Sequence, residues 1–291
     1  MLDLTTKSRT APLRKKKKHI SGGQIAIHVT LLIICALMLY PLGMALWGSF
    51  KTNAEFNISK WYPTIPLYFD NLWTSIEILW PFILNTIFVG GVGTIGVLAV
   101  SAPAAYVFAR KKFPGKNILF FMVIGLMMIP AIMTLVPSFM LYKDMVGTDT
   151  YLILIIPIIT GGSVFATFLL RSFFEGIPEG IFEAARLDGA GDFLCFFRIC
   201  LPLSIPILVT LAIMQLNGAW NDYIWPMIAC PTDSSKLTIA AAIKKEFLSG
   251  NSGSYPVLFS GYLVSSFPLI ALLLFGNKYY IQGLTNSAIK F

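Results

Sequence analysis

Long apolar segments recur along the chain and are separated by short polar stretches. Each is long enough to cross a hydrocarbon core of about 30 Å at about 1.5 Å per helical residue. The segments lack the alternation of a membrane barrel, so helices that satisfy their own backbone groups are expected. The six expected spans are residues 24–48, 82–108, 118–142, 151–170, 203–227 and 257–276.

Prolines lie within several of these segments. A proline removes a backbone donor and clashes with the preceding turn, so kinks are expected at these positions. The prolines concerned are Pro41, Pro103, Pro130, Pro137, Pro157 and Pro268.

The composition agrees with a multi-span membrane protein. Hydrophobic residues make up 56% of the chain and charged residues 12%, about half the share of roughly 25% in an average soluble domain. This balance argues against a soluble enzyme, a disordered protein and a secreted disulfide scaffold. The four cysteines and two histidines show no metal-ligand spacing, so buried or indifferent thiols and no metal site are expected.

Positive charge is concentrated on one set of connecting segments. With the N-terminus inside, 16 of the 22 Lys and Arg residues fall in cytoplasmic segments and six in external ones, which predicts that both termini are cytoplasmic. The leader 1–23 is interpreted as a basic cytoplasmic tail before a six-span domain at 24–291. A nucleic-acid patch and a cleaved signal peptide are both disfavoured.

Two external loops are expected from this topology. Residues 49–81 contain Trp61, Trp73 and Trp80, a residue type suited to the membrane interface. Residues 228–256 contain glycines and serines that favour a flexible segment.

One glycine pattern in the second apolar segment resembles a nucleotide-binding fingerprint. Gly91, Gly93 and Gly96 fit G-x-G-x-x-G, but the dinucleotide fingerprint requires a preceding strand. Within a membrane helix, small residues allow close helix packing, which is the interpretation adopted here. The sequence contains no G-x-x-x-x-G-K-[ST] phosphate-binding loop.

The cytoplasmic stretch 171–202 is long and partly apolar. Pro178 suits the first turn of a helix, and Gly189 and Gly191 suit its end, with Asp192 able to cap the next helix. The expected product is a short surface helix with an apolar face, which Ile177, Ile181, Ala184 and Ala185 would form. From physics alone it could dock another protein or rest on lipid.

The residues of this stretch match a known signature. Glu183-Ala184-Ala185 is followed after three residues by Gly189 and after nine more by Ile199, and Leu201-Pro202 completes the pattern. It resembles, at every fixed position, the EAA loop of ABC importer membrane subunits, EAA-x3-G-x9-I-x-L-P. The ATPase-coupling residues that the resemblance implies are Glu183, Ala184, Ala185, Arg186, Gly189, Ile199, Leu201 and Pro202.

Further stretches extend this resemblance over about residues 25–290. They are Asn85-Thr86, Ala104–Arg110, Gly218–Pro226 and Tyr279–Lys290, with Asn286-Ser287 where Ala-Gly is usual. Together they are similar to the carbohydrate importer permeases of the maltose and multiple-sugar type, in particular the second, six-span subunit.

The resemblance implies an all-α integral membrane protein with six transmembrane helices, the type I (MetI-like) ABC importer permease fold and a cytoplasmic EAA coupling helix. It would lie in the lipid of the bacterial cytoplasmic (inner) membrane and pair with a homologous permease subunit. Two ABC ATPase subunits would dock below, and an extracytoplasmic binding protein would deliver a sugar, expected to be an oligosaccharide. ATP and Mg²⁺ would bind those ATPases, so no enzyme activity and no cofactor are expected in this chain.

A solute path is one interpretation of the residues at the end of the fifth segment. Asn217, Trp220, Asn221 and Ile224 share one helical face, and amides and indoles are suited to sugar hydroxyls and ring faces. Trp220 would lie about 27 Å along the helix from Pro202, near the outer interface, where Trp is common. Interhelical packing is therefore the alternative.

Two alternative functions remain at this point. One is an ABC importer permease for a solute other than a sugar. The other is a stand-alone secondary transporter or channel, which is disfavoured because the spans hold almost no ionisable groups and the EAA loop would be unexplained. A membrane enzyme is weaker still, since the sequence shows no nucleophile–base pair.

Overall fold

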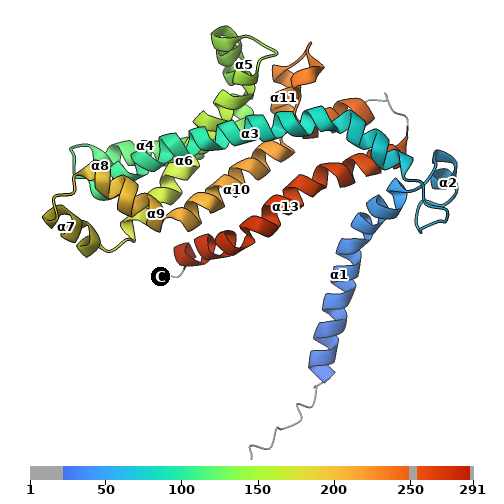
Figure 1. Ribbon diagram of the computed structural model, residues 1–291, viewed down its shortest axis with the longest axis horizontal. Coiled ribbons are helices and arrows are strands. Elements are labelled where there is room, and N and C mark those ends of the chain that lie inside the picture. Colours follow the sequence, from blue (N-terminus) through green and yellow to red (C-terminus); the bar gives the residue numbers. More distant parts are fainter. Residues whose placement is uncertain (1–21, 249–253, 289–291) are drawn as a thin grey trace, which may run out of the picture. The chain divides into compact units, whose positions relative to one another are not determined.

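The computed structural model describes residues 22–248 and 254–288, and the regular elements of this part are helices (Figure 1). The chain divides into two compact units between Met44 and Ala45. The helices are α1 Gly22–Ser49, α2 Asn53–Ile58, α3 Asp70–Arg110, α4 Lys116–Met127, α5 Ala131–Val146, α6 Tyr151–Glu175, α7 Glu179–Leu187, α8 Asp192–Cys195, α9 Leu201–Leu203, α10 Ile205–Asn221, α11 Ile224–Ala229, α12 Ile239–Ile243 and α13 Tyr255–Ala288.

Within the described residues, four helices are long and apolar enough to cross a membrane: α1, α3, α6 and residues Tyr255–Gly276 of α13. Two further pairs meet the same criteria together but are bent, α4 with α5 by 99° and Asp192–Leu203 with α10 by 72°. If each bent pair counts as one span, the helices cover the six expected segments. The division into a tail at 1–23 and a domain at 24–291 stays a prediction.

The third and fifth expected segments are therefore not continuous helices. Pro130, which has no N–H to continue the α4 ladder, begins α5 in an extended conformation. Ser204 separates α9 from α10, with Pro202 and Pro206 on either side. The fifth segment also ends earlier than expected, at Asn221, and α11 is a separate helix. The other prolines for which kinks were expected lie inside continuous helices: Pro41, Pro103, Pro137, Pro157 and Pro268.

Helix α3 is the central element of the second unit. It packs most extensively against α6 and also contacts α10, α12 and α13. Of these, α10 and α13 can be seen beside α3 in Figure 1. One apolar cluster lies at the α7 end of α3, where Phe174 and Phe182 are fully buried. A second lies toward the other end, around Ile153 and Trp225.

The glycines of α3 allow the close packing against α6. A Cβ on Gly93 would lie 2.7 Å from Cγ2 of Ile158, and one on Gly96 would collide with Ile159. A Cβ on Gly91 would meet nothing within 4 Å. The packing interpretation is thus confirmed for Gly93 and Gly96, whereas Gly91 faces open space in this chain.

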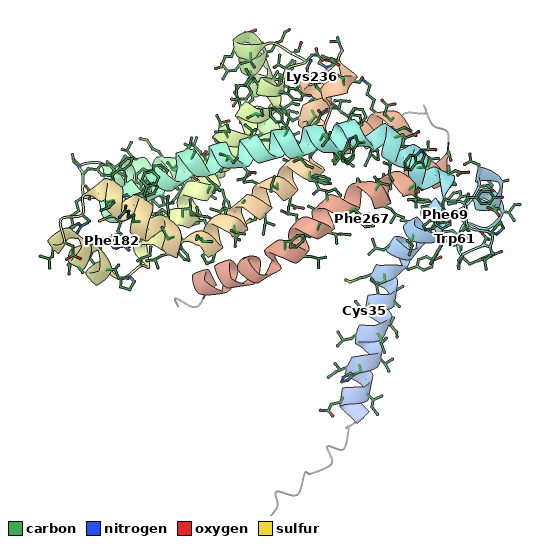
Figure 2. All side chains as sticks on the ribbon, viewed as in Figure 1. Cys35, Trp61, Phe69, Phe182, Lys236 and Phe267 are labelled. Atoms are coloured by element: carbon green, nitrogen blue, oxygen red, sulfur yellow. The ribbon has the colours of Figure 1, made fainter. Side chains whose placement is uncertain are left out.

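The two expected external loops are more ordered than the sequence indicated. Trp73 and Trp80 belong to the first turns of α3, which begins at Asp70, while Trp61 precedes it and is exposed (Figure 2). In the second loop, Leu237, α12 and its neighbours are buried against the core. Its side chains are apolar at this point, which explains the burial, and residues 249–253 lie outside the described part.

A carboxylate holds this second loop to the turn before α6. Asp149 has a positive φ of 56°, and its Oδ1 accepts hydrogen bonds from the backbone N–H of Thr232 at 3.1 Å and of Asp233 at 2.7 Å. Its Oδ2 accepts one from the hydroxyl of Thr232 at 2.7 Å. These donors, the Asp233 amide above all, hold the pKa of Asp149 below its usual range.

We predict that Gly93→Ala lowers the stability of the isolated chain, because Cγ2 and Cβ of Ile158 lie too near the backbone to move aside. The expected cost is about 1–3 kcal/mol. Gly91→Ala, two residues away in open space, is expected to be neutral or slightly stabilising, since Ala is the better helix former. Unfolding of the purified chain in detergent, followed by a thiol-reactive dye at buried Cys195 and Cys200, measures both. Equal melting temperatures for the two variants would show that the contact with Ile158 does not require glycine at position 93.

Candidate functional site

The short helix expected in the EAA region is α7, and it ends as the sequence predicts. Gly189 has φ +86°, a left-handed conformation that residues with a side chain rarely adopt. The N–H of Gly189 donates to the carbonyl of Arg186 at 3.0 Å, and that of Ala190 donates to Ala185 at 2.9 Å. The chain therefore turns sharply after α7. Gly191 is extended instead and precedes α8.

One aromatic side chain anchors α7 to the body of the second unit. Phe182 is fully buried at the α7 end (Figure 2), 4.4 Å from the guanidinium of Arg110 and 6.5 Å, centroid to centroid, from the ring of Tyr106. The expected apolar face of Ile177, Ile181, Ala184 and Ala185 is only partly correct. Ile177 is buried, but Ile181 and Ala184 are exposed, because the large ring of Phe182 turns its own side of the helix inward.

Arg110 ties the last residue of α3 to the corner between α6 and α7. Its Nη1 lies 2.7 Å from Oε2 of Glu179, and its Nη2 donates to the carbonyls of Phe174 and Ile177. Only 6% of the Arg110 side chain is exposed. The guanidinium thus satisfies carbonyls at the end of α6 and also neutralises the first acidic residue of α7. From the sequence, Arg110 was placed among the cytoplasmic charges and in a stretch that extends the resemblance, but none of these contacts was expected.

Two further ion pairs surround this corner. Oε1 of Glu179 accepts a hydrogen bond from Nη1 of Arg186 at 3.3 Å, so Arg186 has a partner on its own helix. Asp192 was expected to cap the next helix, but Gly191 occupies the cap position and the Asp192 carboxylate pairs with Lys111. Since Lys111 directly follows α3, this pair is a second link between α3 and the EAA region.

The opposite side of α7 is open to solvent. Glu183 and Ala184 are exposed, Ala185 is partly buried, and Leu187 is 89% exposed. Among the described residues, no ion pair includes Glu183. A small residue beside a free carboxylate is therefore available to a partner. The role of the EAA residues in docking stays a prediction.

The rest of the EAA pattern lies in the connection to α10. Residues Phe196–Cys200 form a π-helical turn, and α9 follows with Pro202 in its first turn. Ile199 and Leu201 pack against the cluster that contains Phe182, whereas Pro202 is exposed. Cys195 and Cys200 are buried free thiols. Within the described ranges, no group of three His, Cys, Asp or Glu side chains could hold a metal ion.

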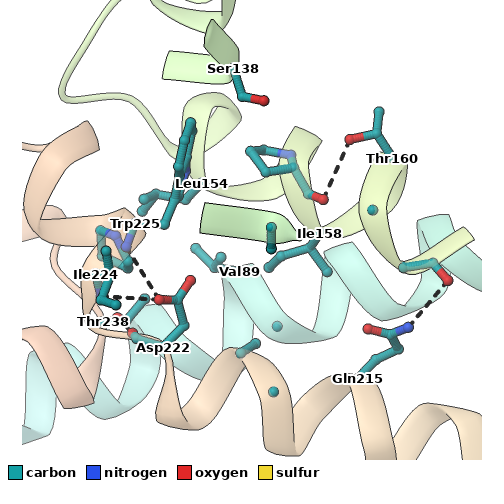
Figure 3. Close-up of a pocket in the computed structure, with 18 of the residues that line it drawn as sticks. Val89, Ser138, Leu154, Ile158, Thr160, Gln215, Asp222, Ile224, Trp225 and Thr238 are labelled. Atoms are coloured by element: carbon teal, nitrogen blue, oxygen red, sulfur yellow. Dashed lines mark hydrogen bonds between the residues drawn. The ribbon is translucent and has the colours of Figure 1, made fainter. Parts of the chain in front are cut away.

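A cavity of about 570 Å³ lies farther along the second unit (Figure 3). It is lined by residues of α3, α5, α6, α10 and α11, and two of its polar groups come from α10 and the residue that follows it. Gln215 donates from Nε2 to the carbonyl of Gly162 at 3.4 Å. Asp222 follows α10, and its Oδ1 accepts from the backbone N–H of Ile224 at 3.1 Å and of Trp225 at 3.2 Å. Sequence reasoning missed both residues.

Of the residues proposed for a solute path, Ile224 lines this cavity, whereas Asn217, Trp220 and Asn221 do not. Trp220 donates from Nε1 to the carbonyl of Ser265 at 3.1 Å, which joins α10 to α13, as the packing alternative expected. Nδ2 of Asn221 donates to the carbonyl of Asn217 at 2.8 Å. Ile224 does not share their helix, because α10 ends at Asn221. Trp220 and Asn221 instead line a smaller cavity of about 400 Å³ with residues of α12 and α13.

Comparisons with known proteins give consistent results. Residues 98–285 match the family described as "Binding-protein-dependent transport system inner membrane component". The chain is 30% identical over 273 residues to the Bacillus subtilis arabinooligosaccharides transport system permease protein AraQ, covering 92% of this chain and 96% of AraQ. It is 29% identical to the sn-glycerol-3-phosphate transport system permease protein UgpE of Yersinia enterocolitica, covering 91% and 97%.

The fold is similar to that of a solved transporter. A chain of a bacterial ABC transporter involved in the import of the acidic polysaccharide alginate matches with a TM-score of 0.78 and 25% identity, over 88% of this chain and 95% of that one. A second alginate transporter structure, in complex with an alginate pentasaccharide-bound periplasmic protein, matches in fold with a TM-score of 0.63 and 17% identity. With the match over residues 98–285, the chain belongs to the family of binding-protein-dependent transport system inner membrane components.

Proposed function

We propose that this chain is the permease subunit of an ATP-driven, binding-protein-dependent carbohydrate importer, and that α7 couples it to the ATPases. The single observation that carries the coupling role is the two-sided nature of α7. Its inner side is fixed by Phe182 and Arg110, while Glu183 and Ala184 face outward. A helix that is rigidly held on one side and open on the other can transmit force from a docked partner.

The partners follow from the same proposal. A homologous permease would complete the path, two ABC ATPase subunits would dock on α7, and an extracytoplasmic binding protein would deliver the solute. Glu183 would make a charge-assisted contact to a basic group of the ATPase. ATP and Mg²⁺ would bind the ATPases, so ATP chemistry belongs to the partners. The names of AraQ and of the alginate transporter support a saccharide as solute.

The same proposal sets the orientation in the membrane. Sixteen of the 22 Lys and Arg residues then lie in cytoplasmic segments, including Arg110, Lys111 and Arg186 beside α7. Both termini are accordingly cytoplasmic, and the cavity lies toward the external side. A second candidate is an importer permease for a solute that is not a sugar, which the similarity to UgpE favours. It would use α7 in the same way.

We predict that Glu183→Lys abolishes coupling without harming the fold. Glu183 is exposed, and its replacement breaks no ion pair among the described residues, but it would set a cation against a cationic partner. The ATPase subunits should co-purify poorly with the membrane complex, and solute-stimulated ATP hydrolysis should be lost.

Arg186→Ala serves as the control for this variant. It removes only a half-exposed pair with Glu179, which is worth about 0–1 kcal/mol, so near-normal coupling is expected. Full ATPase recruitment and full transport by Glu183→Lys would mean that α7 is a lipid-lying element and that the coupling proposal is wrong.

We predict that Gly189→Val impairs coupling, whereas Gly189→Asn is largely tolerated. A Cβ at residue 189 would meet nothing within 4 Å, so both side chains have room. The difference is the φ of +86°, which a β-branched residue disfavours and Asn accepts more readily. ATP-driven uptake in proteoliposomes containing the assembled transporter measures both variants. Equal uptake by Val and Asn would show that the left-handed turn is not required.

A further inference from the structure

The cavity between α5, α6, α10 and α11 has the size of a small-molecule site. Its volume of about 570 Å³ lies within the range of roughly 300–1,000 Å³ typical of ligand pockets. Gly161 and Gly218 line it, and a Cβ on either would meet nothing within 4 Å. Both glycines therefore border open space.

Asp222 presents an unused acceptor to this cavity. Its Oδ1 is occupied by the N–H groups that begin α11, while its second oxygen points into the cavity in Figure 3. No hydrogen bond from a described residue reaches that second oxygen. A carboxylate oxygen in a largely apolar wall is a strong acceptor for a solute hydroxyl.

Gln215 provides a second acceptor at the other end of the cavity. Its amide nitrogen donates a hydrogen bond to the carbonyl of Gly162, and its amide oxygen is available to accept one from a ligand. Gln215 and Asp222 are seven residues apart on the same side of α10, about 10.5 Å along the axis. On the α5–α6 wall, the hydroxyls of Tyr142 and Thr160 lie 2.9 Å apart, and either can donate.

The charge of the cavity selects among solutes. The described residues that line it include the Asp222 carboxylate but no Lys, Arg or His. In a site of low polarity, this carboxylate attracts hydroxyl donors and repels other anions. Carboxylated or phosphorylated solutes would find no compensating cation there.

We propose, on the basis of the importer function above, that this cavity is a subsite for a neutral polyhydroxylated solute, bound through the free oxygen of Asp222 and the amide of Gln215. The specificity of the chain is then for uncharged saccharides. This differs from the anionic solutes named for two of its relatives, sn-glycerol-3-phosphate and alginate.

The test measures binding directly, with the full chain in lipid nanodiscs and saturation-transfer NMR. The probes are the β-1,4-linked mannotriose and the β-1,4-linked mannuronate trisaccharide, which differ only in the oxidation of the C6 groups. Mannotriose is expected to bind at least tenfold more tightly than the uronate. Asp222→Asn keeps an acceptor for the N–H groups of α11 but removes the charge, so mannotriose affinity should fall at least tenfold. The preference over the uronate should also shrink toward one.

Two other variants separate the effect of the Asp222 charge from that of hydrogen bonding by Gln215 and from the smaller cavity. Gln215→Met should weaken mannotriose binding but leave the preference over the uronate unchanged, because no charge is altered. Asn221→Ala, which lines the smaller cavity, should behave as wild type. A melting temperature equal to that of the wild-type chain shows that a variant is folded. If Asp222→Asn does not fold, Gln215→Met still tests whether the cavity binds mannotriose.

Three outcomes would overturn this proposal: no binding of either trisaccharide, equal binding of both by the wild-type chain, or unchanged binding by folded Asp222→Asn. The assay contains no ATPase and no binding protein. Its failure therefore leaves the coupling proposal intact, which depends on Glu183 and Gly189 in the assembled transporter.

Discussion

The packing of α3, α6 and α7 against one another depends on one guanidinium, that of Arg110. Arg110 is the last residue of α3. Its guanidinium contacts one carbonyl in the last turn of α6, one just beyond that helix, the carboxylate of Glu179 and the ring of Phe182. With its side chain almost fully buried, the planar fork satisfies several acceptors that would otherwise be buried without a donor. These contacts join the end of α3 to α7 and to the connection between α6 and α7.

A rigid connection leads from this corner to the cavity. α3 runs without a break from Arg110 to Thr86 in the cavity wall, about 36 Å along its axis, and the close approach at Gly93 joins it to α6. Movement of α7 would therefore displace both helices together. The cavity wall also contains the break before α5 and the end of α10, so it combines rigid helices with two bends. This arrangement suits alternating access by rigid-body motion, the mechanism that the proposed function requires.

Much of the helical arrangement could be predicted from the sequence, because hydropathy indicates the apolar segments and glycines indicate turns and close packing. The six apolar segments, the turn at Gly189 and the packing role of Gly93 all follow from local rules. The inward position of Phe182, the contacts of Arg110 and the cavity at Asp222 could not be predicted, since each depends on residues far apart in the chain. A kink was expected at Pro130, but not a break of 99°, because a proline in a membrane helix is compatible with both a continuous helix and a break. The bend at Ser204 was not expected.

If Arg110 transmits the movement of α7 to α3, its replacement should change the number of ATP molecules hydrolysed per solute imported. Arg110→Lys keeps the charge but cannot reach Glu179 and both carbonyls with one planar group. In the reconstituted transporter, we expect the ATPases to remain docked and the ATP-to-solute ratio to rise several-fold. Arg171→Lys, which affects a pair with Glu175 on α6, should leave that ratio unchanged. An unaltered ratio for Arg110→Lys would show that Arg110 does not transmit the movement of α7.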